Sequence, residues 1–486
     1  MSYNTQSLNL FRFLCIVCAV VYVIVYILLS PGAFNKYLFD VCFLITFVLL
    51  IGFIIQSQKH ELKHHWLKPS YFFVLAFLAV NFQFLLDYRL GLKDNQSSNV
   101  FYPLVFNQCT VLAATGFAAF VAGYFSLRSF PFRRHGYFAT KHKLSLFISL
   151  LQLLVFALFV SNINLVTFLS GVDYGLADSS VSKMYYFENL LYVCNAVIIV
   201  LVANRNDISN LKGYINAFPT LSLIIIILYM IMRLVSGDRG PFIYTALLLL
   251  FGYLYSSRKI IKFSTVVVFL LSALLFISLI GIARSLDKTY SFSDRIAMAF
   301  DYFSENGRFN SEDRSVLSLT EELGYSFVVN QIDVNAVEVQ GEPHHYGAYQ
   351  LITIASSIPF VPGLIANVFH VRSEDFSSSG FANYHLFGGY ERTYGIGTTI
   401  LGDFYLDFGV IGVLFGLFLA GLLFCFLDAS ICYRPKEEIG IYLLLFIILF
   451  SAKAVYIPRS VLLIDLQGFV LGSIIIYVNS LLSKNK

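Results

Sequence analysis

Long apolar runs dominate the hydrophobic pattern of this 486-residue chain. Twelve runs can be read in order, and a helix of about 20 apolar residues is long enough to span a bilayer. They lie near residues 10–29, 38–56, 70–88, 104–127, 144–160, 185–203, 217–235, 241–257, 263–283, 404–427, 439–457 and 461–480. A transmembrane barrel would instead show alternating segments of about ten residues. The pattern therefore predicts an all-α polytopic membrane protein with about 12 transmembrane helices.

One connection between these runs is far longer than the others and begins at Arg284. It divides the chain into residues 1–284 with nine predicted spans, a large loop over residues 285–397, and residues 398–486 with three spans. A connection of this length usually carries function rather than acting as a plain linker.

Three segments of the loop predict helices that do not cross the membrane. Ser293–Ser304 and Leu317–Val339 have apolar residues at helical spacing, which indicates amphipathic interfacial helices. Tyr349–Phe369 is uncharged and resembles a thirteenth span, but Pro359 and Pro362 interrupt it. We therefore expect a re-entrant or interfacial segment there.

The composition agrees with a membrane protein. Hydrophobic residues make up 58% of the chain and charged residues 13%, whereas a soluble chain has roughly 45–50% and 25%. The net charge of +4 is spread over connections, which argues against a nucleic-acid partner. All seven cysteines lie in or beside apolar runs, so we expect no disulfide framework. Walker A and Asp-x-Asp sequences do not occur, so ATP, nucleotide sugars and cofactors are not expected.

Lys and Arg residues set the expected orientation. One set of alternate connections, together with the C-terminal tail, carries about twice as many of them as the opposite set. Because cytoplasmic connections are enriched in Lys and Arg, both termini should be cytoplasmic and the large loop should be periplasmic.

Arginines mark the expected outer ends of several spans. Pro241 suits the first turn of the eighth span, so Arg239 lies beside a helix N-terminus with free N–H groups. Together with Arg233 it suits a phosphate or diphosphate, although arginines also serve as plain anchors of helix ends. Three more cations are candidates for the same anion site: Arg284, Lys453 and Arg459.

The large loop contains candidate general bases. Glu322 lies in Ser318–Tyr325, and His344 and His345 lie in Gly341–Gly347. Glu391 is a fourth candidate, and the choice among the four stays open. Each of them could equally be a polar or capping residue of the loop. Adjacent histidines do not easily share a metal and no third ligand is evident, so we expect no metal site.

The tenth predicted span begins with two aspartates. Asp403 and Asp407 are four residues apart, on one helix face, where like charges repel by roughly 0.2–0.5 kcal/mol unless an arginine or a cation compensates them. They are possible supporting residues of the site. Gly412, Gly416 and Ala420 line another face of this span with small side chains, which favours close helix packing within the chain.

Four of these segments can now be taken together: Ser236–Pro241, Glu322–Gly324, the region of Pro359, and Gly395–Gly409. They resemble the Wzy-type O-antigen (oligosaccharide repeat-unit) polymerases, over roughly residues 220–430 and in the layout of spans and outer loop. The paired arginine–glycine loop motifs described for some members of that family are not recognisable here. The resemblance therefore leaves open which cations act.

The resemblance implies a membrane glycosyltransferase with a GT-C-like fold at the outer face of the bacterial inner membrane. Its substrates would be repeat units carried on undecaprenyl diphosphate. A sugar hydroxyl of one unit would attack the anomeric carbon of the growing chain, and undecaprenyl diphosphate would leave. Cations would stabilise the leaving diphosphate, and a carboxylate or histidine would take the proton. The resemblance also admits a chain-length regulator protein as a partner.

Two other functions fit parts of the pattern. An O-antigen ligase would share the fold, the donor and the cations, and would differ in its acceptor, the lipid A core. A 12-span transporter or a flippase of lipid-linked oligosaccharides would share the number of spans. The common six-plus-six transporters place their long loop centrally and inside, and a flippase needs no large outer loop.

We predict that a reporter fused near Ser378 reads periplasmic, because span parity and the Lys and Arg distribution place 284–397 outside. The measurement is the activity of alkaline phosphatase and of a cytoplasm-active reporter fused at that position. A cytoplasmic signal would reverse the orientation and remove the basis for an outer site.

Overall fold

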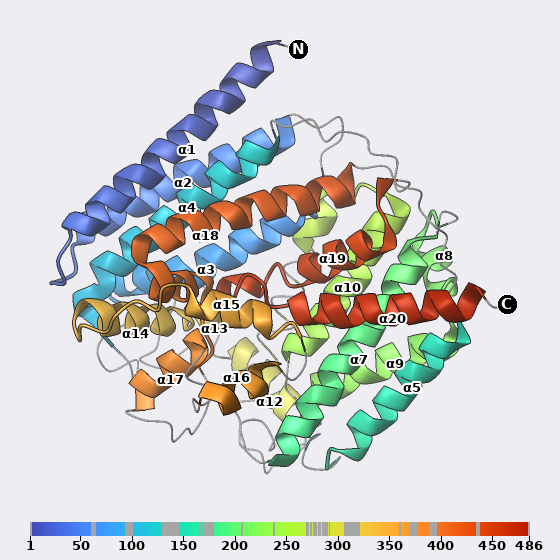
Figure 1. Cartoon of the computed structure of the whole chain (residues 1–486). Helices are drawn as coiled ribbons and strands as arrows, with labels where there is room; N and C mark the ends of the chain where they lie inside the picture. Colours follow the sequence, from blue (N-terminus) through green and yellow to red (C-terminus); the bar gives the residue numbers. More distant parts are fainter. Residues whose placement is uncertain are drawn as a thin grey trace. The chain divides into compact units, whose positions relative to one another are not determined.

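The computed structural model describes most of the chain. The described residues are 2–59, 65–92, 101–128, 145–164, 168, 179–205, 208–236, 239–268, 272, 275, 279, 283, 290, 292–305, 321–358, 361–369, 377–387, 396–433 and 438–484. Within these ranges the secondary structure is entirely helical, as the apolar pattern predicts (Figure 1).

Eight helices are long and apolar enough to cross a membrane. They are α1 (Ser2–Leu28), α2 (Lys36–Lys59), α3 (Pro69–Arg89), α4 (Phe106–Arg128), α7 (Ser179–Ala203), α10 (Arg239–Ser257), α18 (Ile400–Cys432) and α20 (Leu466–Lys484). Three shorter apolar helices are α5 (Leu146–Ser161), α9 (Thr220–Val235) and α19 (Ile441–Ala452). All of these coincide with predicted runs. The run near residues 263–283 lies largely outside the described residues, so the count of twelve stays a prediction.

The large loop contains short helices. They are α12 (Phe292–Glu305), α13 (Glu321–Gly324), α14 (Phe327–Glu338), α15 (Ala348–Ala355), α16 (Val361–Phe369) and α17 (Ser378–Phe387). The uncharged segment Tyr349–Phe369 is divided between α15 and α16, which have 8 and 9 residues. Neither is long enough to cross a bilayer, which agrees with the predicted re-entrant or interfacial segment.

The chain forms two compact units. Unit 1 comprises Met1–Phe132, Ser311–Asp428 and Ala454–Ile464, and unit 2 comprises Arg133–Asn310, Ala429–Lys453 and Asp465–Lys486. In unit 1, α4 contacts α1, α2, α3 and α14. In unit 2, α7 contacts α5, α9, α10, α19 and α20. Unit 2 also contains the short helix α8 (Leu211–Asn216), whereas η1 (Pro103–Val105) and η5 (Ile457–Arg459) belong to unit 1.

Glycines bring α4 and α18 together in the core of unit 1. A Cβ atom at Gly123 would collide with the carbonyl oxygen of Phe418, and one at Gly421 would collide with that of Phe120. The two backbones can therefore approach closely only because both positions lack a side chain. Small residues have this role in many membrane helix pairs.

The helix α18 is broken near its start. Phe408 and Gly409 have non-helical dihedrals, and Gly409 has a φ of +63°. Residues 400–407 turn back against the rest of α18, because Gly412 faces the carbonyl oxygen of Phe404 and Gly416 faces its ring. The predicted stripe of small residues thus makes contacts within the chain, as expected. The longer helix begins at Val410.

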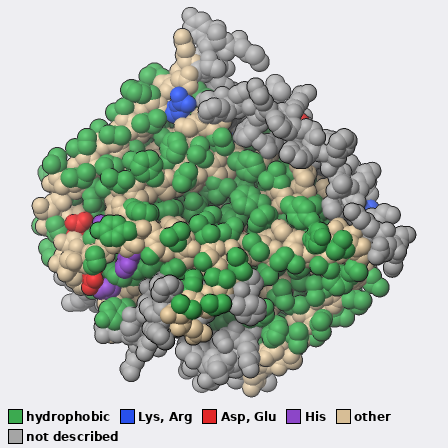
Figure 2. Space-filling model, in the orientation of Figure 1, with side chains coloured by type: hydrophobic (Ala, Val, Ile, Leu, Met, Phe, Trp, Pro, Cys, Tyr) green, Lys and Arg blue, Asp and Glu red, His purple; other side chains and the backbone are tan. Residues whose placement is uncertain are grey.

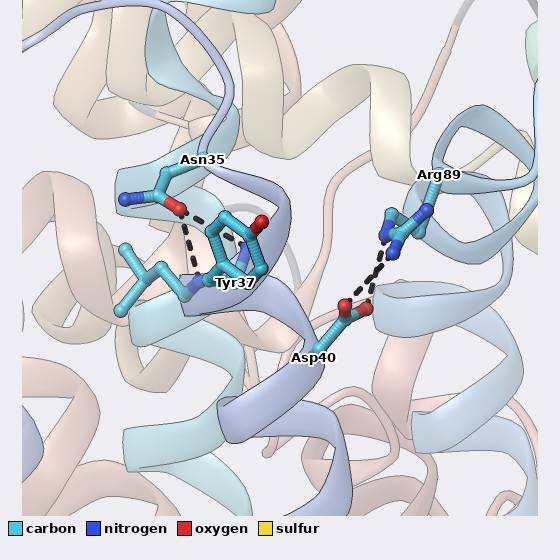
Figure 3. A network of polar contacts seen from close by, with 5 residues as sticks. Asn35, Tyr37, Asp40 and Arg89 are labelled. Atoms are coloured by element: carbon cyan, nitrogen blue, oxygen red, sulfur yellow. Dashed lines mark hydrogen bonds and ion pairs between the residues drawn. The ribbon is translucent and has the colours of Figure 1, made fainter.

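A small cavity lies in unit 1 where the α1–α2 connection meets the end of α3. It has a volume of about 460 Å³ and is lined by Ala33, Phe34, Asn35, Lys36, Tyr37 and Arg89. Asn35 accepts hydrogen bonds from the backbone N–H groups of Tyr37 and Leu38, which caps α2 (Figure 3). Arg89 donates two hydrogen bonds to Asp40, at 2.9 and 3.0 Å. A carboxylate therefore already compensates the charge of Arg89.

Candidate functional site

Acidic and histidine side chains gather on one part of the surface of unit 1. They lie over α14 and the connection that follows it, on a face that is otherwise mostly hydrophobic (Figure 2). Hydrogen bonds and ring contacts connect Glu338, His344, His345, Asp403 and Asp407, directly or through the residues between them, and these five are called the acid–histidine site below. Glu338 and both histidines are half-buried, and the two aspartates are buried.

The connection with the two histidines is tied to the break in α18. His345 donates its backbone N–H to the carbonyl of Leu406, and Tyr346 donates to that of Asp407, both at 2.9 Å. Carbonyl groups at the end of a helix have no partner within that helix. The break therefore provides the acceptors that fix residues 345 and 346.

Asp407 makes the reciprocal link. Its side chain accepts backbone hydrogen bonds from Tyr349 (3.2 Å) and Gln350 (3.0 Å), in the first turn of α15. A carboxylate at a helix N-terminus is stabilised by the free N–H groups and by the helix dipole. The link holds α15 against the break in α18.

Asp403 is held by neutral donors. One oxygen accepts from the hydroxyl of Ser378 at 2.7 Å, and the other accepts from the side-chain amide of Gln350. We had expected an arginine or a cation to compensate Asp403 and Asp407. Among the described residues, the donors are instead a helix N-terminus, an amide and a hydroxyl. These donors come from α15 and α17, far from α18 in the sequence, so the spacing of the aspartates could not reveal them.

His345 is held against aromatic side chains. Its Nε2 atom shares a hydrogen bond with the hydroxyl of Tyr349 at 3.1 Å, and its ring lies 4.5 Å from the ring of Tyr349. The ring of Phe381 meets it edge-on at 5.4 Å. Loss of solvation lowers the pKa of His345 below its ordinary value, although Asp407 opposes this shift. His345 is therefore neutral at pH 7 and able to accept a proton.

Glu338 has partners from two other helices. Its Oε1 atom accepts hydrogen bonds from the hydroxyls of Tyr405 (2.7 Å) and Tyr26 (2.9 Å). The ring of His344 lies edge-on against Tyr405 at 5.6 Å. Tyr26 is near the end of α1, so this part of the site is level with one end of that span. Glu338, Tyr26 and Tyr405 could not be singled out from the sequence, because polar residues in apolar or amphipathic runs give no local signal of the partners they find in other helices.

A further carboxyl group, Asp333, is buried beside the site. Its exposed fraction is 0%, and neither oxygen has a hydrogen-bond partner among the described residues. Burial raises the pKa of Asp333 well above its ordinary value, and the nearby Asp403 adds to this shift. Burial in this place therefore favours the uncharged form of the Asp333 carboxyl group. It packs directly against the backbone of Gly402, where a Cβ atom would collide with the carboxyl group.

Two predicted cations of unit 2 have acidic partners. Arg233 is 3% exposed and forms an ion pair with Glu188 of α7, which also accepts a hydrogen bond from Tyr229. Lys453 lies 4.0 Å from Asp465 and 3.4 Å from the centre of the Tyr244 ring. Glu188 and Asp465 were not singled out from the sequence.

The structure brings Arg233, Arg239 and Lys453 to the same end of unit 2. Lys453 also lies over the ring of Tyr192, which is one helical turn from Glu188, the partner of Arg233. Arg239 is the first residue of α10, and the neighbouring Gly240 packs against Tyr244, the other ring beneath Lys453. Arg239 itself is half-buried.

The remaining predicted residues are placed differently. Arg459 belongs to unit 1 and lies over the ring of Tyr456 at 5.9 Å. Glu322 lies in α13, and the structure does not describe its side chain. Arg284 and Glu391 lie outside the described residues. In the described part of the chain, no three His, Cys, Asp or Glu side chains converge to hold a metal ion.

Comparison with protein families gives one decisive match. The family model described as "O-antigen polysaccharide polymerase Wzy" matches residues 11–486. The chain belongs to this family. Comparisons with curated proteins and with solved structures give no match.

Membership in the Wzy family confirms the resemblance drawn from four short segments. The match extends well beyond residues 220–430, because it includes all the N-terminal spans. The chain is thus a polytopic membrane protein of a polymerase family. Two of the segments, Glu322–Gly324 and Gly395–Gly409, overlap α13 and the broken start of α18 in unit 1.

Proposed function

We propose that this Wzy-family protein joins oligosaccharide repeat units carried on undecaprenyl diphosphate, at the periplasmic face of the bacterial inner membrane. The observation that carries the proposal is the family match over residues 11–486. The polymer would be an O-antigen or a related capsule polysaccharide. The same proposal includes about twelve spans, cytoplasmic termini, a GT-C-like architecture and a chain-length regulator as a partner.

The proposed reaction needs a base. A hydroxyl oxygen of the acceptor sugar bonds to the anomeric carbon of the donor while the bond from that carbon to the diphosphate breaks. The electron pair leaves with undecaprenyl diphosphate, and the hydroxyl proton passes to the enzyme. We assign the role of base to His345, because this histidine is neutral and half-buried. In the tautomer whose Nε2–H donates to the hydroxyl of Tyr349, Nδ1 carries the lone pair that takes the proton. His344, Glu322 and Glu391 stay predictions for this role.

The leaving group needs positive charge. Departure of a diphosphate is assisted by cations and by helix N-termini placed where the charge develops. Arg239 at the start of α10 has both features. Lys453 and Arg233 lie at the same end of unit 2, and their acidic partners would hold their side chains in place. Arg284 and Arg459 complete the proposed set of cations.

The function is tested by the carbohydrate pattern of a deletion strain. We expect the strain to make O-antigen limited to one repeat unit, because ligation proceeds without polymerisation. The measurement is gel electrophoresis of lipopolysaccharide or capsule, with the restored gene as the control. A strain that attaches no repeat unit at all would identify a ligase, and a strain with a normal ladder would exclude both enzymes.

We expect Arg239→Ala to abolish the polymer at unchanged protein level, because loss of a charged contact to a diphosphate costs about 2–5 kcal/mol. Arg239→Lys should rescue it only in part, because lysine lacks the bidentate geometry. The measurement is binding of undecaprenyl diphosphate to the purified protein, alongside polymer formation. Arg89→Ala is the control, because Arg89 is an exposed arginine paired with Asp40. Full activity of Arg239→Ala would reduce this residue to a helix-end anchor.

We expect His345→Gln to slow chain extension by roughly 10²–10⁴-fold, the usual contribution of a positioned base, while binding of undecaprenyl diphosphate is kept. His345→Ala should behave alike. Because burial lowers the pKa of His345, its neutral form persists on acidification below about 6.5, the ordinary histidine value. The rate of the wild type should therefore fall on acidification, with half of it lost at a pH below 6.5.

The control is His385→Gln. Burial also lowers the pKa of His385, whose Nδ1 atom hydrogen-bonds Gln340 at 3.1 Å. This variant should keep the wild-type rate at pH 7 and should still lose rate on acidification, because His385 is only a minor influence on the pKa of His345. The measurement is the rate of polymerisation of purified lipid-linked repeat units between pH 5 and 8. A near wild-type rate for His345→Gln would show that His345 is part of the scaffold and that the base is another group.

A further inference from the structure

The carboxylate of Glu338 is fixed in place by groups from distant parts of unit 1. Glu338 is the last residue of α14, and its Oε1 atom holds the hydroxyls of Tyr26 from α1 and Tyr405 from α18. The hydroxyl oxygens of the two tyrosines lie 2.9 Å from each other. Hydrogen bonds to a charged group are the strong ones in proteins. The orientation of the carboxylate is therefore set before any ligand binds.

The second oxygen of Glu338, Oε2, makes no hydrogen bond with a residue that the structure describes. The hydrogen bonds that Glu338 makes with described residues all use Oε1. The residue is half-buried in unit 1. Oε2 can therefore accept a hydrogen bond from a molecule that reaches it.

A second polar group without a partner lies close by. The ring of His344 packs edge-on against Tyr405, the residue that holds Glu338. Its Nδ1 atom is buried and has no hydrogen-bond partner in the described part of the chain. Such a group normally finds a partner, and an unmet one calls for an explanation. A hydroxyl group of a ligand that displaces the atoms now covering Nδ1 would provide that partner.

Two consecutive residues of α18 hold the side chain of Glu338 and the backbone of His345. Tyr405 holds the side chain of Glu338, and the carbonyl of Leu406 holds the backbone of His345. Both links start from the same turn of α18, so the break in that helix helps to position the carboxylate of Glu338 and the backbone of His345.

We propose that Glu338 and His344 form the subsite that binds hydroxyl groups of the acceptor sugar and orients it toward His345. This inference rests on the proposed function and adds the group that selects the acceptor. An anionic ligand would be repelled by the carboxylate. A neutral sugar donates a hydroxyl to Oε2 without disturbing the two tyrosine bonds, whereas protonation of the carboxylate would weaken both. Glu338 thus suits binding, and His345 suits proton transfer.

The first test measures binding without the reaction. The probe is the repeat-unit oligosaccharide, released by mild acid from the lipid-linked unit of the host strain, and the readout is saturation-transfer NMR with the full chain in detergent. We expect the wild type to bind it and Glu338→Gln to bind it roughly tenfold or more weakly, as for a lost hydrogen bond to a charged group. The single oxygen of the glutamine amide stays with the two tyrosine hydroxyls, and its NH2 group, which replaces Oε2, cannot accept a hydrogen bond from the sugar hydroxyl.

Two variants serve as comparisons. Glu342→Gln removes an exposed carboxylate four residues further along and should bind as the wild type does. His345→Gln should also keep its affinity, although it loses turnover. Equal affinity of the wild type and Glu338→Gln would overturn the proposal, and so would absence of saturation transfer to the wild type.

The second test separates binding from chemistry during turnover. Preformed polymer on its lipid carrier is kept at a fixed concentration as the donor, and the single lipid-linked repeat unit is varied as the acceptor. We expect Glu338→Gln to raise the acceptor KM by roughly tenfold or more with kcat within a few-fold of wild type. Tyr26→Phe removes one anchor, leaves Glu338 in place, and should raise KM by a few-fold.

The outcomes distinguish the two proposals. A lowered kcat at unchanged KM for Glu338→Gln would make Glu338 the base and overturn the binding role. A wild-type KM in both variants would overturn the subsite while leaving the polymerase intact. Binding of the free oligosaccharide by a wild-type protein that forms no polymer would instead refute the proposed function and keep the subsite.

Discussion

The break in α18 is the constraint on which the candidate site depends. A helix that stops inside an apolar region leaves carbonyl groups without partners, and an unpaired buried polar group costs about 1–3 kcal/mol. The carbonyls of Leu406 and Asp407 are met by the backbone of His345 and Tyr346, and the side chain of Asp407 meets the start of α15. The broken start of α18 and the start of α15 thus provide hydrogen-bond partners for each other, and these links position His344 and His345.

This arrangement uses a general property of membrane proteins. Irregular backbone is tolerated at membrane depth only where protein groups or water satisfy it. Gly409 allows the turn through its positive φ, and Gly412 allows the folded-back segment to approach the longer helix. A larger side chain at position 412 would push residues 400–407 away and would move the groups that hold His345 and Glu338.

Buried charged side chains in each unit likewise have hydrogen-bond or ion-pair partners. Asp428 is buried and accepts hydrogen bonds from the backbone and hydroxyl of Ser70 and from the hydroxyl of Tyr124. The pairs of Arg233 with Glu188 and of Lys453 with Asp465 neutralise charge within unit 2. Breaking a buried pair leaves an uncompensated charge, which commonly costs about 3–5 kcal/mol. When a variant of these residues makes no polymer, its folding stability has to be measured as well.

The amino-acid sequence by itself determined the helical membrane class, the position of most spans and the division of Tyr349–Phe369, because runs of about 20 apolar residues and prolines act locally. It also pointed to His344, His345, Asp403 and Asp407 as separate candidates, and four short segments indicated the family.

Only the tertiary structure decided that the two histidines and the two aspartates form one site. The contact joins residues about 60 positions apart, and no periodicity encodes such a distance. Glu338 and Tyr26 are polar residues in amphipathic or apolar helices, and their partners come from other helices. Hydrogen bonding and burial are properties of the packed chain, so only the folded structure shows which partners and which role these residues have.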